Sequence, residues 1–376
     1  MKSVLKFLRI LFVLLLLACA ILYFTPYRYL FKGVASTYLR GRSSAHYLDK
    51  AYFKQRTVPN AGSMVSLPHS SKYNRIPLSA ELLSRLSQNH SGSFLVLYKD
   101  SLLVEKYFNP VNDTTRTNSF SAVKTVITLL VQLAIQDGKI KSWDQKVVDF
   151  LPWLKGEYAK DLTLRHLSTM TSGSDWDESY HNPFGITARA YYSDDILSAM
   201  KTVQINQSPG AEYRYQSGNT QLLGMALQAA VKMPVSNWLS EKLWKPLGME
   251  SEASWHLDAE DGTELMYCCL NARSRDFARI GQMLLHNGGG LIDSSFIAMA
   301  TQPYKSENYG HAFWLGSSGT MKYYNLQGIQ GQYIAVVPDK HLVIVRTGEG
   351  WEKKIKGGHS DLQFYVDESV RLFTHK

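Results

Sequence analysis

The distribution of apolar and polar residues divides the chain into three parts. Residues 10–24 are uncharged and continuously apolar. Residues 33–75 show no period, which predicts a linker that wraps onto the following body. From residue 76 onward, strand-like and helix-like patterns follow one another without internal repeats. We therefore expect an N-terminal segment over 1–32, a linker over 33–75 and one folded domain over 76–376.

Strand patterns lie near both ends of the body, and helical patterns lie between them. Runs at 93–98 and 102–107 predict an early hairpin, and runs at 332–337 and 341–346 predict a late one. Helical periodicity dominates from about 140 to 310. This order predicts an α+β fold, an α/β sandwich whose antiparallel sheet is built from both chain ends and carries an inserted helical subdomain. The predicted helices cover residues 77–86, about 121–136, 194–201, 220–232, 235–243, 273–286, 294–301 and a C-terminal amphipathic stretch.

One helical run opens on two polar residues, Ser121 and Lys124. Residues three apart lie on one helix face, with Cβ atoms about 5–6 Å apart. A serine hydroxyl needs a base to act as a nucleophile, and a lysine serves when burial leaves it neutral. Ser121 would also lie in the first helical turn, where free N–H groups favour developing negative charge. The pair therefore predicts a nucleophile and its base, although so short a motif also occurs by chance.

The charge of the chain is concentrated near its beginning. The 376 residues carry a net charge of +9, and residues 1–60 hold ten basic residues and one acidic residue. The rest of the chain is therefore neutral and has no basic face, so we do not expect nucleic-acid binding. The 45% of hydrophobic residues is typical of a globular protein.

The basic, apolar head predicts a membrane segment. From Phe7 to Phe24 the run reaches the roughly 17–20 residues that a span requires. It could be an uncleaved anchor, a signal peptide cut after Ala20, or a lipoprotein signal acylated at Cys19. The run continues past Cys19, which favours the anchor. The other two cysteines, Cys268-Cys269, are adjacent, so we expect buried apolar packing and no disulfide framework.

Several stretches of the body, taken in order, resemble one family. They are similar to the serine β-lactamase-like hydrolases, which include class C β-lactamases, D,D-peptidases, esterases and 6-aminohexanoate-dimer hydrolases. The resemblance covers roughly residues 76–376, and its first motif is Ser121-Ala122-Val123-Lys124. The other stretches that carry it are 164–173, 209–219 with Leu222-Leu223-Gly224, 244–249 and 271–279.

The resemblance implies roles for individual residues. Ser121 is implied as the nucleophile, Lys124 as its base, and Tyr215 as a shuttle of protons to the leaving group. The backbone N–H groups of Ser121 and Ile329 are implied as an oxyanion hole. The loop 174–190, with its aromatic residues Trp176, Tyr180, His181 and Phe184, is expected to set specificity. The residues implied in substrate binding are Ser217, Asn271, Gly328 and Trp176.

The third motif of the family falls on Leu326-Gln327-Gly328. Leu326 takes the place of the Lys or His that opens this motif in β-lactamases and D,D-peptidases. A β-lactam carboxylate would then lack its usual cation, unless Lys322 or Arg346 supplied one. We therefore expect an esterase or amidase that acts on a small-molecule or peptide-like substrate through an acyl-enzyme. D,D-peptidase, penicillin-binding or weak β-lactamase activity is the alternative.

The sequence lacks the motifs of two other classes of hydrolase. A Ser-His-Asp hydrolase needs a Gly-x-Ser-x-Gly elbow, and a zinc hydrolase needs His-Glu-x-x-His; the sequence has neither. We expect no metal and no cofactor, structural roles for His166 and His311, and a turn and helix cap at His359. A non-catalytic, membrane-tethered binding protein on the same fold is the alternative of another class. The resemblance to the family also implies that the body lies outside the cytoplasm, in the periplasm or at the cell surface.

Overall fold

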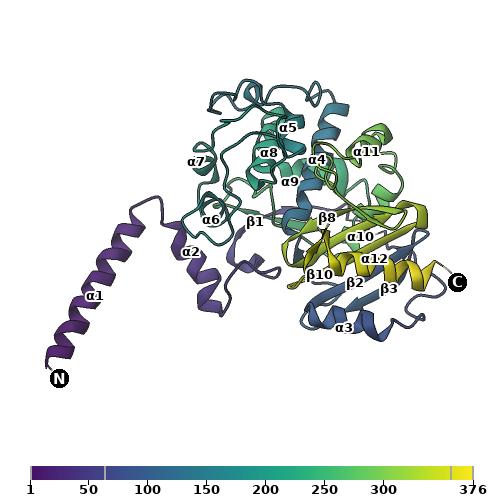
Figure 1. Ribbon diagram of the computed structural model, residues 1–376, viewed down its shortest axis with the longest axis horizontal. Coiled ribbons are helices and arrows are strands. Elements are labelled where there is room, and N and C mark those ends of the chain that lie inside the picture. The colour runs from purple at the N-terminus through teal and green to yellow at the C-terminus, as the bar shows by residue number, and fades with distance from the viewer. Residues whose placement is uncertain (1, 63–64, 356–357, 375–376) are drawn as a thin grey trace.

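A six-stranded antiparallel sheet is assembled from the two ends of the body in the computed structural model (Figure 1), in the order β3-β2-β10-β9-β8-β7. The structure describes residues 2–62, 65–355 and 358–374. Pairing of β2 with β10 joins the early and late hairpins, which confirms that both chain ends build one sheet. The strands are β2 (Ser91–Tyr98), β3 (Ser101–Tyr107), β7 (Trp314–Ser318), β8 (Met321–Gly328), β9 (Gln332–Val337) and β10 (Leu342–Gly348).

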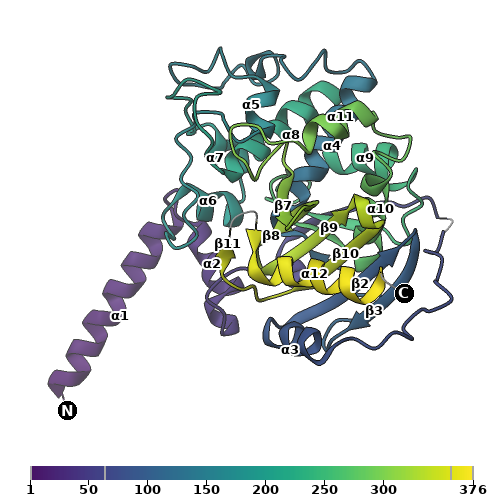
Figure 2. The same cartoon turned by 45° about the vertical axis from the view of Figure 1, so that its right-hand side comes forward.

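Alternate residues of the central strands face two different cores, as the period of two in a strand requires. Phe94 and Val96 of β2 pack with α3 and α12 on the outer face of the sheet. Leu95 and Leu97 pack with α4 and α10 on the other face. The sheet is thus covered on both sides, as Figure 2 shows for α12 in front and α10 behind. The covering helices are α3 (Ala80–Gln88), α12 (Ser360–Phe373), α4 (Val123–Gln136) and α10 (Ser274–Leu285).

The predicted helical subdomain is inserted between β3 and β7, with α4 as its central helix. Twelve of the fourteen residues of α4 are buried, which explains its almost unbroken apolar sequence. A second antiparallel sheet, β1-β5-β6-β4, lies beside these helices. Its strands are β1 (Lys54–Val58), β4 (Thr117–Asn118), β5 (Ala253–Leu257) and β6 (Leu270–Ala272). The further helices are α5 (Leu164–Ser168), α6 (Ile186–Tyr192), α7 (Ile196–Met200), α8 (Ser217–Val231), α9 (Val235–Leu239) and α11 (Ser294–Ala300).

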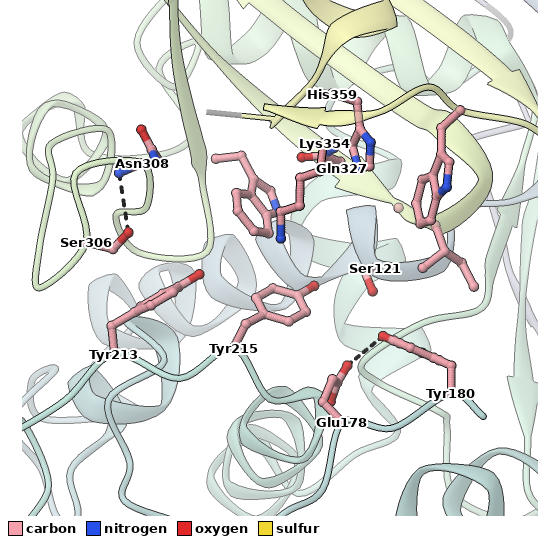
Figure 3. A pocket seen from close by; sticks show the side chains of 14 residues that line it. Ser121, Glu178, Tyr180, Tyr213, Tyr215, Ser306, Asn308, Gln327, Lys354 and His359 are labelled. Atoms are coloured by element: carbon pink, nitrogen blue, oxygen red, sulfur yellow. Dashed lines mark hydrogen bonds between the residues drawn. The ribbon is translucent and has the colours of Figure 1, made fainter. Parts of the chain in front are cut away.

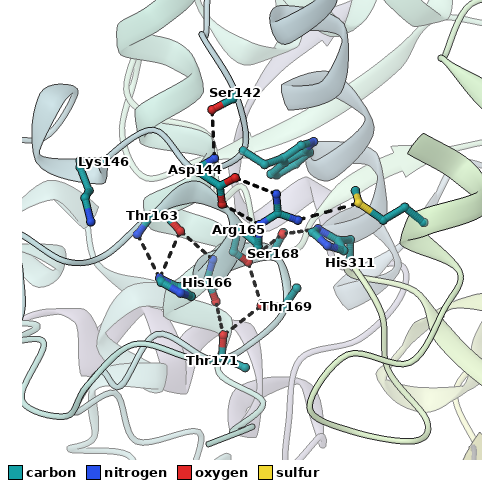
Figure 4. Close-up of polar contacts among 12 residues, drawn as sticks. Ser142, Asp144, Lys146, Thr163, Arg165, His166, Ser168, Thr169, Thr171 and His311 are labelled. Atoms are coloured by element: carbon teal, nitrogen blue, oxygen red, sulfur yellow. Dashed lines mark hydrogen bonds and ion pairs between the residues drawn. The ribbon is translucent and has the colours of Figure 1, made fainter. Parts of the chain in front are cut away.

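Two histidines make structural hydrogen bonds at α5 (Figure 4). Thr163 caps α5 by accepting a hydrogen bond from the N–H of His166, and the imidazole of His166 accepts from the N–H of Thr163 at 3.2 Å. His311 is hydrogen bonded to the Ser168 hydroxyl at 2.9 Å. Burial lowers the pKa of both imidazoles, and that of His311 falls to about 3. The contacts agree with the structural roles predicted for both residues.

The chain before residue 76 contains helices and a strand that the sequence pattern did not predict in full. Helix α1 (Lys2–Tyr23) has a mean hydropathy of 2.6 and is long enough to cross a membrane, a property that a signal sequence shares. The stretch 33–75, predicted as a linker, contains the end of α2 (Tyr29–Ser36) and all of β1. β1 is an edge strand that pairs with β5 through five residues. A polar edge strand carries no strong alternation, so the sequence pattern could not reveal it.

Candidate active site

Ser121 and Lys124 lie together at the N-terminal end of α4. Ser121 belongs to a 3₁₀ turn, Phe120–Ala122, which precedes the α-helix rather than forming its first turn as we expected. The Nζ atom of Lys124 is 2.8 Å from the Ser121 Oγ atom. It also donates a hydrogen bond to the carbonyl oxygen of Tyr267, at 2.9 Å. The spacing of three residues thus places the amine directly beside the hydroxyl.

Burial makes Lys124 a usable base. The side chain is 1% exposed, and burial lowers its pKa to about 8, against a smaller opposing effect of the Glu178 carboxylate. Near neutral pH a substantial minority of Lys124 is therefore unprotonated, and the lone pair can accept a proton from Ser121. A lysine in water, with its ordinary pKa of 10.5, would be almost entirely charged.

Tyr215 completes the group from the loop before α8. Its ring centroid lies 5.3 Å from the Lys124 Nζ atom, and its hydroxyl interacts with the Ser121 side chain. Burial raises the Tyr215 pKa far above its usual range, and the hydrogen bond to Ser121 only partly offsets this. The phenol is therefore protonated. In Figure 3 it points toward Ser121, where it can pass a proton to a departing group.

The end of β8 passes close to the turn that holds Ser121. A Cβ atom added to Gly328 would lie 2.3 Å from the carbonyl oxygen of Ser119, so only glycine fits at this crossing. Ile329 follows immediately and lines the same cavity as Ser121. The fully buried guanidinium of Arg346 fixes this loop by donating to the carbonyl oxygens of Gln330, at 2.8 Å, and of the next residue, at 2.9 Å.

These residues open into a cavity of about 480 Å³ (Figure 3). Its walls come from the loop around residue 180, the loop before α8, β7, the end of β8 and the chain just before α12. The lining residues are Ser121, Glu178, Tyr180, Tyr213, Tyr215, Ser306, Asn308, Trp314, Gln327, Gly328, Ile329, Trp351, Lys354 and His359.

Glu178 organises one wall, and the sequence analysis missed it. Its carboxylate accepts from the Ser217 N–H at 2.6 Å and hydroxyl at 2.7 Å, from the Trp176 indole at 2.8 Å, and from the Tyr180 hydroxyl at 2.6 Å. These four hydrogen bonds satisfy both carboxylate oxygens of Glu178 and hold Ser217, Trp176 and Tyr180 in place. The signal that could have found it is its place between Trp176 and Tyr180 in the loop that was expected to set specificity.

Two residues implied in substrate binding lie behind the cavity wall. Trp176 is buried under α8 and reaches the site only through Glu178. Asn271 lies in β6, where its side-chain amide donates to the carbonyl oxygens of Ser254, at 3.3 Å, and Cys269, at 3.1 Å. Asn271 is not among the residues that line the cavity, and its role in substrate binding stays a prediction. Its neighbour Cys269 is joined to Cys268 in a disulfide, so the pair does not remain as two packed thiols.

The cations of the cavity differ from those we anticipated. Arg346 is buried in its structural role, and Lys322 lines a separate hollow beside Asp339. Instead, Lys354 and His359 reach the site from a short hairpin before α12. His359 is the N-cap residue of α12, as predicted, and also lines the cavity. No sequence signal marked Lys354, because it reads as one of several exposed lysines.

Within the part of the chain that the structure describes, no group of three or more His, Cys, Asp or Glu side chains is arranged to hold a metal ion. A hydroxyl beside a neutral amine and a protonated phenol suits acyl transfer to serine.

Comparison with known proteins identifies the family. The sequence model described as Beta-lactamase matches residues 80–353. The 6-aminohexanoate-dimer hydrolase of Paenarthrobacter ureafaciens is 23% identical over 294 residues, which cover 71% of this chain and 74% of that protein. A candidate 6-aminohexanoate-dimer hydrolase from Bacillus anthracis superposes with a TM-score of 0.73 at 19% identity, covering 86% of this chain and 92% of that one.

A D-stereospecific amidohydrolase from Streptomyces sp. superposes with a TM-score of 0.59 at 14% identity, covering 79% of this chain and 98% of that one. At such identities the structural matches establish the fold, and the family match rests on most of the body. The chain belongs to the β-lactamase family, the serine β-lactamase-like hydrolases.

Proposed function

We propose that this protein is a membrane-tethered serine hydrolase that cleaves an ester or amide through an acyl-enzyme. The observation that carries the proposal is the 2.8 Å contact between Lys124 Nζ and Ser121 Oγ, made by a lysine whose burial lowers its pKa to about 8. The relatives reported above are named as hydrolases, one of them as an amidohydrolase, which supports this class over a non-catalytic binding protein.

The reaction begins when Ser121 Oγ attacks the substrate carbonyl carbon and Lys124 accepts the hydroxyl proton. The N–H groups of Ser121 and Ile329 stabilise the negative charge that develops on the carbonyl oxygen. Tyr215 passes a proton to the departing alcohol or amine, which leaves Ser121 acylated. Water then attacks the ester, with the same groups moving the proton in the opposite sense.

The pH dependence tests the role of Lys124. We expect kcat/KM for p-nitrophenyl butyrate to rise about tenfold per pH unit below pH 8 and to level off above it. The reason is that only neutral Lys124 accepts the Ser121 proton, and its pKa lies near 8. The measurement is the initial rate from pH 5.5 to 9.5, corrected for spontaneous hydrolysis. A flat profile between pH 6 and 9 would exclude Lys124 as the base.

We expect a preference for uncharged esters over β-lactams. Leu326 is fully buried and offers no charge, and Lys354 is exposed. A solvent-exposed ion pair contributes about 0–1 kcal/mol, against about 1.5–3 kcal/mol for a desolvated charged hydrogen bond. Lys354 therefore does not replace the cation that the third motif lacks. The purified protein should hydrolyse p-nitrophenyl butyrate measurably and nitrocefin slowly or not at all.

A pair of lysine variants sharpens this test. Lys354→Ala removes the cavity cation, and Lys353→Ala removes the neighbouring lysine, which does not line the cavity. Both should alter the small nitrocefin rate by less than about fivefold. A kcat/KM for nitrocefin above that for every ester tried, lost in Lys354→Ala alone, would show that Lys354 serves as a β-lactam carboxylate receptor.

A further inference from the structure

The segment after α1 is fixed to the body beside the cavity. Tyr29 of α2 is buried, and its hydroxyl donates a hydrogen bond to the carbonyl oxygen of Pro183 at 2.9 Å. The Lys32 ammonium donates to the carbonyl oxygen of Asp258 at 3.3 Å and lies 3.6 Å from the Asp194 carboxylate. Two independent polar anchors therefore hold α2 on the chain at residues 183 and 194 and on the end of β5.

The chain between the two helices is too short to let the body move far from α1. Only Phe24–Arg28 separates α1 from α2. Fully extended, this stretch spans about 20 Å, and a hydrogen bond from the Arg28 N–H to the carbonyl oxygen of Thr25 folds it into a turn. Whatever the tilt of α1, the start of α2 stays within that distance of its C-terminal end, and Tyr29 keeps the surface around Pro183 next to α2.

The loop that receives α2 is the loop that forms one wall of the cavity. Glu178 and Tyr180 line the cavity, and Pro183 and Phe184 follow within a few residues. The ring of Phe184 meets the ring of Tyr27 edge to face, with centroids 5.6 Å apart. In Figure 2, α2, α6 and β11 (Lys354–Ile355) of the cavity hairpin occupy the same side of the molecule.

Large aromatic side chains are left in solvent at this junction. Phe24 is 85% exposed, Phe184 61%, Tyr27 41% and Phe31 40%. We call these four residues the aromatic shelf. They come from both the tether and the body, and the basic residue Arg28 lies among them, over the ring of Tyr23. Tyrosine is enriched where a protein meets the lipid headgroups, and segments that lie in this interface combine phenylalanine with basic side chains.

We propose that the aromatic shelf rests in the interface of the bilayer that holds α1 and presents the mouth of the cavity to that surface. The bilayer is favoured over a second protein because α1 ends directly at the shelf. The inference builds on the proposed function and narrows its substrate class. The substrate is an amphiphilic ester or amide whose apolar part stays in the bilayer while its scissile carbonyl enters the cavity.

Labelling in vesicles tests the position of the shelf. The full-length protein, with Cys19→Ser to remove the only free thiol in the described chain, receives Phe184→Cys or Ala298→Cys and an environment-sensitive NBD label. Ala298 is an exposed residue of α11, which lies across the helical region from α2 in both views (Figures 1 and 2). The vesicles contain phosphatidylethanolamine and phosphatidylglycerol, with or without doxyl-labelled lipid.

We expect the doxyl lipid to quench the label at position 184 and to leave that at 298 unchanged. Equal, weak quenching at both positions would overturn the inference, even if the protein is integral and active. A purified protein whose mass lacks α1 would overturn the tether and the shelf together. Labelling of Ser121 by a fluorophosphonate on the same samples reports separately on the proposed hydrolase.

A second experiment measures the consequence for substrates. Phe24→Ser, on the tether side of the shelf, should reduce hydrolysis of vesicle-borne p-nitrophenyl palmitate by about fivefold or more and leave hydrolysis of soluble p-nitrophenyl acetate unchanged. Met299→Ser is the matched control, because it also replaces an exposed apolar side chain, on α11. An equal loss with both esters, or an equal loss in the control, would contradict presentation of the substrate from the bilayer.

Discussion

Ser121→Ala abolishes covalent labelling by a fluorophosphonate and lowers ester turnover by at least about 10³-fold; this is the largest effect we expect. The reason is that the variant removes the only atom that can form the acyl-enzyme in the proposed reaction. Lys124 and Tyr215 remain in place, but without Ser121 Oγ they have no nucleophile to serve.

The matched control for this variant is Ser119→Ala, two residues earlier in the same turn. The Ser119 hydroxyl is buried and donates only to the carbonyl oxygen of Phe120, at 3.2 Å. It should retain labelling and turnover. Thermal unfolding of both variants should match that of the wild type, because neither change empties a large volume. Undiminished hydrolysis by purified Ser121→Ala would exclude the mechanism.

The sequence pattern was sufficient for the two hairpins that join the chain ends in one sheet and for the Ser-Lys pair, because these depend on local patterns, whereas β7 was not predicted. The runs at 93–98 and 102–107 predicted the early hairpin, and the structure forms it as β2 and β3. The three-residue spacing of Ser121 and Lys124 needed only helical geometry, which even the intervening 3₁₀ turn preserves well enough for a 2.8 Å contact.

The other residues of the cavity are brought together by contacts between distant parts of the chain, which the local sequence pattern cannot predict. Tyr215 is one tyrosine among 22 in the sequence and was found only through the family resemblance. Lys354 reaches the site because a hairpin before α12 folds over β7, where its amine lies 5.7 Å from the ring centroid of Trp314. Asn271 was also singled out only through the family resemblance, and its amide donates to the carbonyl oxygen of Cys269 in the structure.

Lys124→Met and Tyr215→Phe are each expected to lower the rate by about 10²–10⁴-fold, the usual range for general acid–base groups. Lys124→Arg should be as inactive as Lys124→Met, because a guanidinium keeps the charge but does not lose its proton.

Lys124 also affects the free energy of unfolding. Above pH 8, the unfolded chain keeps the Lys124 proton that the folded chain has lost, so the free energy of unfolding rises with pH toward the ordinary pKa of 10.5. At neutral pH the buried ammonium is a cost, so Lys124→Met should not lower the melting temperature.

The double variant decides whether Lys124 and Tyr215 belong to one proton relay. Both contact Ser121, through the 2.8 Å hydrogen bond of Lys124 and the hydroxyl interaction of Tyr215. If each step of proton transfer requires both groups, removing the second costs little once the first is gone. The measurement is kcat/KM for p-nitrophenyl butyrate in the wild type, both single variants and the double variant. A loss in the double variant close to that of the worse single variant supports the relay, whereas a loss equal to the product of the two single losses would mean that the groups act independently.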